Sequence, residues 1–103
     1  MDALTNAQIR VLKAQAQQMK ATLKIGKEGI SAQFLAALDE ELKRHELVKV
    51  KFEEFKEQKK ELAPRLAEQS DSHLVTRVGN VVVLYRAKGR PQERQKGDVN
   101  SNG

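Results

Sequence analysis

The sequence predicts an α+β fold in which a small four-stranded mixed sheet packs against helices. Three observations support it. First, apolar residues recur at helical spacing in three segments. Second, apolar and polar residues alternate in the segments that lie between these three. Third, a Gly-Asn pair separates two β-rich runs near the end of the sequence. The predicted order is helix, strand, helix, strand, helix, strand, strand. Of the 103 residues, we expect 1–87 to form one domain and 88–103 to form a disordered basic tail.

The first helix is predicted at about residues 5–20. Thr5 and Gln8 have the spacing of a capping box, in which each side chain accepts a hydrogen bond from a backbone N–H group at the start of the helix. The apolar stripe that follows at helical spacing consists of Ile9, Leu12, Ala16 and Met19. A polar and mostly basic stripe runs beside it and consists of Arg10, Lys13, Gln17 and Lys20.

The middle of the chain predicts a strand, a helix and a second strand. Residues 21–25 alternate apolar and polar side chains before a glycine, as a short strand does. Ser31 is a suitable N-cap for a helix over residues 32–46. Residues 47–52 alternate in the manner of a half-buried strand. One face of this strand carries Val48, Val50 and Phe52, and the other carries Leu47, Lys49 and Lys51.

A third helix is predicted within residues 56–70, where leucine and alanine recur at helical spacing. Pro64 conflicts with it, because a proline deep in a helix costs about 3 kcal/mol, whereas one in the first turn costs little. We therefore expect the helix either to start late, near Leu62, or to bend at Pro64. Beyond this helix, residues 73–78 and 81–86 are predicted to pair as a hairpin around the Gly-Asn turn.

The composition excludes several classes of protein. There is no cysteine, which excludes disulfides, thiolate catalysis and cysteine-ligated zinc. No apolar run approaches the roughly 20 residues of a membrane-spanning helix, and the first residues lack a secretory pattern, so we expect a cytoplasmic protein. Neither His45 nor His73 has an acid at metal-binding spacing, and the known phosphate-loop, dinucleotide and nucleophile-elbow motifs are missing. We expect no catalytic residue, metal, cofactor or small-molecule substrate.

The net charge is +5, and the basic excess lies at the two ends of the sequence. Residues 1–30 hold five Lys and Arg against two acids, residues 31–72 hold eight against ten, and residues 73–103 hold six against two. If the fold brings the ends together, they form one positive face that attracts a polyanion. Lysines that only solvate a small protein explain the charge equally well. For the tail we favour solvation over an RNA-binding arm, because acids, Gly, Asn and Ser dilute its charge.

The stretch IGKEGIS, residues 25–31, lies between the first predicted strand and the second helix. Gly26 and Gly29 have no Cβ, so a sugar-phosphate backbone can approach the main chain, and the free N–H groups of the helix favour an anion. KH domains bind the nucleic-acid backbone with such a loop. Taken alone, the two glycines fit a plain strand-to-helix turn better. Together with the basic ends and the Lys49/Lys51 strand face, they favour nucleic acid.

These motifs resemble the YhbY-type, or CRM, RNA-binding domain from about Leu4 to Arg86. The resemblance rests on LKAQA in the first helix, then IGKEGI, LDEELKRHELVKVKF, a third helix and LVTRVGNVVVLYR, in that order. It implies a compact α/β domain similar to the C-terminal domain of bacterial initiation factor three, with a KH-like glycine loop. Bacterial single-domain members of this family associate with precursors of the large ribosomal subunit, and plant members with several copies act in group II intron splicing. This chain resembles the bacterial type.

Two departures from the family stand out. Residues 69–73 read QSDSH where relatives commonly have a Thr-Gly-Gly-like turn, which leaves the geometry of this turn open. Pro64 is atypical in the third helix. The family's loop is matched at Gly26, Lys27 and Gly29, with Glu28 at its variable position.

The resemblance and the residues together predict a monomeric RNA-binding protein that is not an enzyme and that binds ribosomal RNA in large-subunit precursors. The expected RNA contacts are Gly26, Lys27, Glu28, Gly29, Arg10, Lys13, Lys49, Lys51, Arg86 and Lys88. The three phenylalanines fall mostly at core-like positions, so besides Tyr85 few aromatic side chains remain for stacking, and we expect recognition of RNA backbone and shape. The rival hypotheses are a protein–protein adaptor that docks on the ribosome through the first helix, a binder of another structured RNA, an initiation-factor-like protein and a small enzyme.

Overall fold

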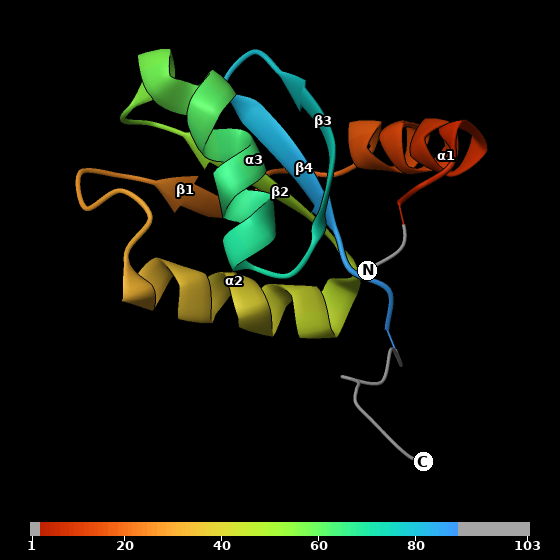
Figure 1. Cartoon of the computed structure of the whole chain (residues 1–103), viewed down its shortest axis with the longest axis horizontal. Coiled ribbons are helices and arrows are strands. Elements are labelled where there is room, and N and C mark those ends of the chain that lie inside the picture. Colours follow the sequence, from red (N-terminus) through yellow and green to blue (C-terminus); the bar gives the residue numbers. More distant parts are fainter. Residues whose placement is uncertain (1–2, 89–103) are drawn as a thin grey trace.

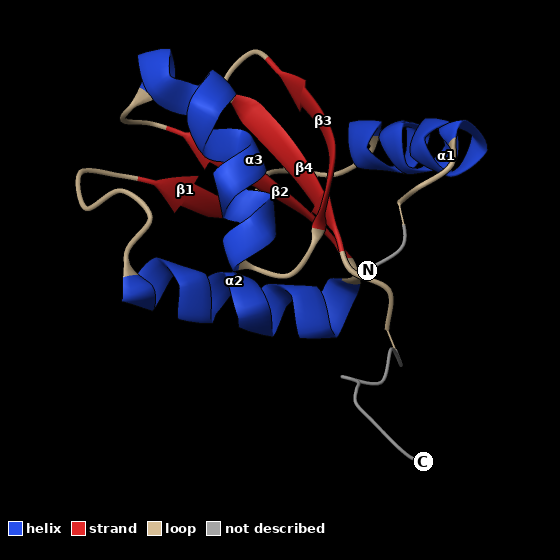
Figure 2. Cartoon of the chain, in the orientation of Figure 1, coloured by secondary structure: helices blue, strands red, loops and turns tan. Residues whose placement is uncertain are grey.

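The computed structural model describes residues 3–88, and the order of its helices and strands is the predicted one (Figures 1 and 2). Of the predicted disordered tail, all but Lys88 lies outside the described residues. The elements are α1 (Asn6–Gln17), β1 (Leu23–Ile25), α2 (Ala32–His45), β2 (Leu47–Phe52), the short 3-10 helix η1 (Lys56–Gln58), α3 (Lys59–Gln69), β3 (His73–Val78) and β4 (Val81–Tyr85).

The four strands form one mixed sheet in the order β1-β2-β4-β3, which confirms the predicted fold class. β1 and β2 are parallel, whereas β4 runs antiparallel to both β2 and β3. The β3–β4 hairpin turns at Gly79 and Asn80, as predicted, and Gly79 has a φ of 58°, a left-handed conformation that suits glycine. Because β1 and β2 are parallel, the loops that follow them leave the same edge of the sheet.

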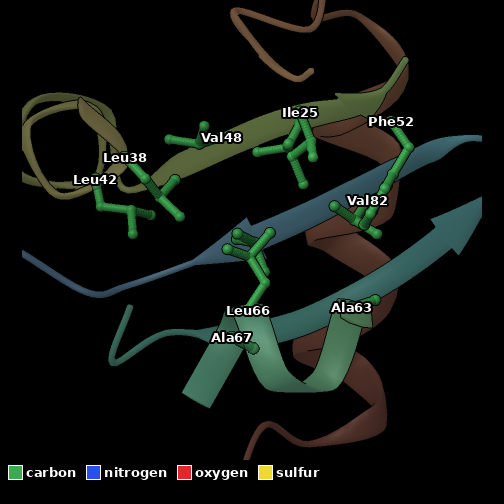
Figure 3. Packing of buried hydrophobic residues seen from close by; sticks show 11 residues of the cluster. Ile25, Leu38, Leu42, Val48, Phe52, Ala63, Leu66, Ala67 and Val82 are labelled. Atoms are coloured by element: carbon green, nitrogen blue, oxygen red, sulfur yellow. The ribbon is translucent and has the colours of Figure 1, made fainter. Parts of the chain in front are cut away.

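The main hydrophobic core lies between one face of the sheet and the two helices α2 and α3 (Figure 3). It includes the alternating residues of β2 that the sequence assigns to one strand face, and Phe52 is the largest of its fully buried side chains. Burying a side chain of this size contributes about 1.5–3 kcal/mol to the stability of the folded state. The buried members are Ile25, Leu38, Leu42, Val48, Val50, Phe52, Ala63, Leu66, Ala67, Val82 and Leu84.

α1 packs on the opposite face of the sheet and forms a second, smaller core. In Figure 1 it stands apart from α2 and α3, beside the strands. The strand residues beneath it are neighbours of main-core residues in the sequence but point to the other face, as the pleat requires. The molecule therefore has three layers, with helices on both faces of the sheet. The buried residues of this second core are Leu12, Ala16, Leu47, Val75 and Val83.

Both predicted helix starts are confirmed by their caps. The Thr5 N–H group donates to Gln8 Oε1 at 2.8 Å, and the Gln8 N–H group donates to Thr5 Oγ1 at 3.1 Å, which completes the capping box. At α2, the Phe34 N–H group donates to Ser31 Oγ at 3.0 Å. α1 ends at Gln17, earlier than the predicted residue 20.

Of the two alternatives left open for α3, the late start near Leu62 is wrong. The helix begins at Lys59, directly after η1, and Pro64 lies inside it with an exposed ring. Ala63, Leu66 and Ala67 on the opposite side are buried against the sheet. Most of a helix's stability in a protein comes from such packing. Here the free energy gained by packing outweighs the cost of the backbone hydrogen bond that Pro64 cannot donate.

The turn between α3 and β3, which departs from the family pattern, is built without glycine. Asp71 has a φ of 53°, in the left-handed region that aspartate tolerates better than most residues. Ser70 and Ser72 are buried and their hydroxyl oxygens lie 2.8 Å apart, within hydrogen-bonding distance. The Ser70 hydroxyl also donates to the Leu66 carbonyl at 2.8 Å. These contacts satisfy the buried hydroxyl groups and fix the turn.

Candidate functional site

The glycine loop, residues 26–31, connects β1 to α2 at the edge where the two parallel strands end (Figure 1). The Gly29 N–H group donates to the Gly26 carbonyl at 3.0 Å, which closes a tight turn. Gly29 has a φ of 68°, which a side chain would strain. Nothing lies within 4 Å of the place where a Cβ of Gly26 would be, so the main chain at Gly26 is open to an approaching ligand.

The N-terminus of α2 adds free N–H groups to this loop. Ser31 satisfies the N–H group of Phe34, but those of Ala32 and Gln33 belong to a first turn and have no partner within the helix. Both residues are exposed. The helix dipole places partial positive charge here. Lys27 and Glu28 are exposed at the tip of the loop, so one cation and one carboxylate flank the N–H groups. An anion is favoured at this end of α2.

The loop after β2 lies directly against the glycine loop. The N–H groups of Glu53 and Glu54 both donate to the Ile25 carbonyl at 3.0 Å. Phe55 follows, and a Cβ built on Gly29 would lie 3.4 Å from its ring. Phe55 is 41% exposed. The sequence analysis missed this residue, although its position in the charged run EEFKE, beyond the alternating strand, is a signal for exposure.

Lys49 has a structural role, in contrast to its predicted place on a binding surface. It is half-buried beneath α1, and its Nζ donates to the carbonyl oxygens of Ala16 at 3.0 Å and Met19 at 2.9 Å. These carbonyls lie at the C-terminal end of α1, where the helix dipole favours a cation. Lys49 therefore fastens the end of α1 to the sheet.

Replacing Lys49 with methionine is expected to lower the free energy of unfolding by about 1–2 kcal/mol, because two charge-assisted hydrogen bonds to carbonyl oxygens are lost. Thermal or urea unfolding measures this. Lys51 is the matched control, since it lies two residues along the same strand face and is exposed. Lys51→Met should leave the stability unchanged, and equal losses in the two variants would contradict the role of Lys49.

Arg86 is likewise used inside the fold. Its guanidinium Nη2 lies 2.9 Å from Asp39 Oδ1 and donates to the Ser70 carbonyl at 2.5 Å, while Nε donates to the Asp71 carbonyl at 3.2 Å. The side chain is only 16% exposed. Burial raises the pKa of Asp39, but hydrogen bonds and charges from Arg86 and Lys43 outweigh this and lower the pKa below its usual value. Arg86 thus joins α2, the turn before β3 and the end of β4.

The remaining predicted contacts divide between two ends of the molecule. Lys51 pairs across the strands with Lys24, whose Nζ lies 3.5 Å from Glu53 Oε2. Both lysines are exposed on the β1–β2 side of the sheet, next to the glycine loop. α1 carries the exposed Arg10 and Lys13 at the opposite end (Figure 1). At the chain's last described residue, the Lys88 N–H group donates to Glu46 Oε2 at 2.8 Å.

Within residues 3–88, no helix is both long and apolar enough to cross a lipid bilayer. The same residues contain no group of His, Asp and Glu side chains that could hold a metal ion.

Comparison with known proteins identifies the family of this chain. The family model described as the CRS1 / YhbY (CRM) domain matches residues 4–86. The probable RNA-binding protein YqeI of Bacillus subtilis is 33% identical over 84 residues, which cover 81% of this chain and 88% of that protein. A probable RNA-binding protein of Pseudomonas aeruginosa is 32% identical over 92 residues, with 88% of each chain covered.

Two further relatives agree. A probable RNA-binding protein of Methanocaldococcus jannaschii is 35% identical over 88 residues, which cover 82% of this chain but only 65% of that longer protein. The solution structure of the hypothetical protein SAV1595 from Staphylococcus aureus superposes with a TM-score of 0.72 at 34% identity and covers 91% of this chain and 100% of that one. On these grounds the chain belongs to the CRS1/YhbY (CRM) domain family.

Proposed function

We propose that this protein binds RNA through the glycine loop and the N-terminus of α2, and that it acts by binding rather than by catalysis. The observation that carries the proposal is the set of free N–H groups at Ala32 and Gln33, beside the Cβ-free main chain of Gly26. A phosphate of the RNA backbone can accept hydrogen bonds from these groups. Membership of a family whose relatives are named as RNA-binding proteins supports RNA as the anion.

The proposed contact surface has two parts. The first consists of the glycine loop with Gly26, Lys27, Glu28 and Gly29, extended by Lys51 on the sheet. The second consists of Arg10 and Lys13 on α1, with Lys88. Lys49 and Arg86 are left out, because their charged groups are bound within the fold. Since the two parts lie at opposite ends, an RNA that contacts both must be extended or present a broad surface.

We propose ribosomal RNA in precursors of the large ribosomal subunit as this partner, with the protein acting as a monomer in the cytoplasm. The alignments cover 88% of both the Bacillus and the Pseudomonas proteins, and these bacterial relatives support a protein of the bacterial type. The broad surface of a ribosomal precursor also suits a binding site in two separated parts.

Sedimentation of a cell lysate through a sucrose gradient tests this partner. We expect the protein to travel with the large-subunit precursor, and to move to the top of the gradient after RNase treatment. Release by RNase argues that RNA, and not only protein, holds it on the particle. A protein that stays at the top of the gradient without RNase would refute the ribosomal assignment and direct the search to a small free RNA.

The affinity for RNA is expected to fall with rising salt, because bound phosphates release counterions. For single-stranded RNA, the slope of log K against log salt is about −0.7 per phosphate contacted, so contacts by the five proposed cations would give a steep slope of about −3.5. Titrations of a labelled RNA over a salt series measure the slope. Lys27→Ala should make it shallower by about 0.7. A slope near zero would exclude phosphate contacts as the basis of binding.

One observation favours a second candidate function, docking on a ribosomal protein through α1. Val11 on this helix is 57% exposed, beside an apolar groove of about 290 Å³. The groove is lined by Leu4, Ala7, Gln8, Val11, Leu12 and Tyr85. Val11→Gln separates the two functions: it would weaken docking through the apolar groove on α1, but it leaves the charge beside Arg10 and Lys13 unchanged and should leave RNA binding intact.

A further inference from the structure

Phe55 is an exposed aromatic side chain for which the proposed function gives no role. Among residues 3–88 it is the only phenylalanine or tyrosine that is exposed, since Phe52 is buried and Phe34 and Tyr85 are half-buried. Its ring lies beside Gly29, with Cε2 3.4 Å from where a Cβ of that glycine would be. The edge of the ring at Cε2 and Cζ therefore lies against the glycine loop, while 41% of the residue is exposed to solvent.

The backbone of Phe55 is in an unusual conformation that holds the ring in this place. Its φ is 59°, in the left-handed region that bulky residues rarely adopt. The Phe55 carbonyl accepts the Gln58 N–H group at 3.0 Å, which starts η1. Glycine or asparagine would fit this position with less strain. An aromatic residue is unfavourable here, because the backbone is strained and the ring is exposed to water. Such strained residues are typical of functional sites, so we infer that the ring serves binding rather than stability.

A groove of about 320 Å³ opens between Phe55 and α3, within the size range of small-molecule sites. Its α3 side is one stripe at helical spacing. Leu62 in this stripe is apolar and half-buried, whereas Arg65, Gln69 and the preceding Gln58 of η1 are polar and exposed. Within the described residues Arg65 has no ion-pair partner, so its guanidinium is available to a ligand.

A supported aromatic ring beside amide and guanidinium groups has the chemistry that recognises a nucleobase. Unpaired bases stack on aromatic side chains and form hydrogen bonds through their edges. We propose, on the basis of the proposed function, that this groove binds one unpaired base of a single-stranded RNA segment, stacked on Phe55, with its edge toward Arg65 and the two glutamines. The phosphate that adjoins this base lies at the glycine loop, which forms the other wall of the groove.

The charges around Phe55 give the bound nucleotide one orientation. Glu54 and Glu57 are exposed on the segment that carries the ring and outnumber the exposed Lys56 between them, so this side on balance repels phosphate. On the other side, Lys27 and the N-terminus of α2 attract it. The phosphate therefore belongs on the glycine side of the groove and the base on the Phe55 side. A base in a duplex is already stacked and paired, so duplex RNA cannot place one there.

Phe55→Trp gives a direct optical test, because the natural chain contains no tryptophan. We expect the fluorescence of the new indole to be quenched when single-stranded RNA of mixed sequence is added, and to change little with the duplex of the same sequence. Val78→Trp is the matched control, since Val78 is 69% exposed at the end of the β3–β4 hairpin. Equal quenching in the two variants, or none in Phe55→Trp while RNA binds, would overturn the stacking role.

Phe55→Gly tests the energetic contribution, since glycine accepts the φ of 59° and only the ring is lost. The affinity for single-stranded RNA should fall about 10- to 100-fold, whereas the affinity for the duplex should be unchanged. A circular dichroism spectrum and an unfolding midpoint like those of the natural protein show that the fold is kept. If Phe55→Gly binds single-stranded RNA as tightly as the natural chain, the inference is wrong and backbone recognition stands. If the natural chain binds neither RNA, the proposed function fails as well.

Discussion

Gly29→Asp is expected to weaken RNA binding at least tenfold, the largest effect of any substitution in the glycine loop. The new carboxylate would add a negative charge to the loop that precedes the N-terminus of α2, where it repels phosphate. Aspartate tolerates a left-handed φ better than most residues, and its Cβ would make only an ordinary contact with Phe55. The cost in stability should therefore stay near 1–2 kcal/mol.

Gly29→Asn is the matched control, because asparagine has the same shape and the same tolerance of positive φ but no charge. Fluorescence anisotropy of a labelled RNA compares the three proteins. The Asn variant should bind with an affinity between those of the natural protein and the Asp variant. If Asp and Asn weaken binding equally, shape rather than charge governs the loop. If neither weakens it, the RNA does not contact Gly29.

Arg86→Met is expected to lower the free energy of unfolding by about 2–3 kcal/mol while leaving RNA affinity unchanged. Methionine fills a similar volume, but Asp39 and the carbonyls of Ser70 and Asp71 lose their charged donor. Urea unfolding measures the loss. Arg44→Met is the control, since Arg44 is 63% exposed and its nitrogen lies 3.7 Å from Glu41, an ion pair that contributes little. An Arg86 variant of natural stability and weak RNA binding would restore its predicted role as a contact.

The same variant should change the response to acid. Because the pKa of Asp39 is lowered in the folded protein, its ionised form contributes stability that is fully present above the ordinary value of 3.8. This contribution is lost as the pH falls through the lower folded pKa. With Arg86 removed, less of the stability depends on the charge of Asp39. In this pH window the natural protein should therefore lose more of its free energy of unfolding on acidification than the variant does. Acid unfolding curves of the same shape for the two proteins would show that Arg86 does not lower the pKa of Asp39.

The sequence predicted the elements whose signals are local. The Thr5/Gln8 capping box, the Ser31 cap and the Gly79-Asn80 turn each depend on a few neighbouring residues, and each lies where it was expected. The start of α3 was not predictable in this way. It depends on the packing of the helix against the sheet, which no pattern around Pro64 reveals.

The candidate site was predicted less completely, because the role of a charged side chain depends on distant partners. Lys49 alternates correctly for an exposed strand face, yet the carbonyls that it binds lie 33 and 30 residues earlier in the chain. Arg86 bonds to residues 15 and 16 positions away, and to Asp39 on α2. The three phenylalanines were expected mostly at core-like positions and Phe55 was not singled out, whereas in the structure it follows β2 with a left-handed backbone and is exposed.

The apolar residues form two separate cores, one on each face of the sheet. The sheet separates the second core, formed by two buried residues of α1 and three of the strands, from the main core, so releasing α1 removes no contact between the sheet and α2 or α3. Such partial opening requires less free energy than global unfolding. In the opened form the Lys49 amine and the apolar face of Leu47 and Val83 become available to solvent. The Lys49 hydrogen bonds, which hold the end of α1, would oppose this opening.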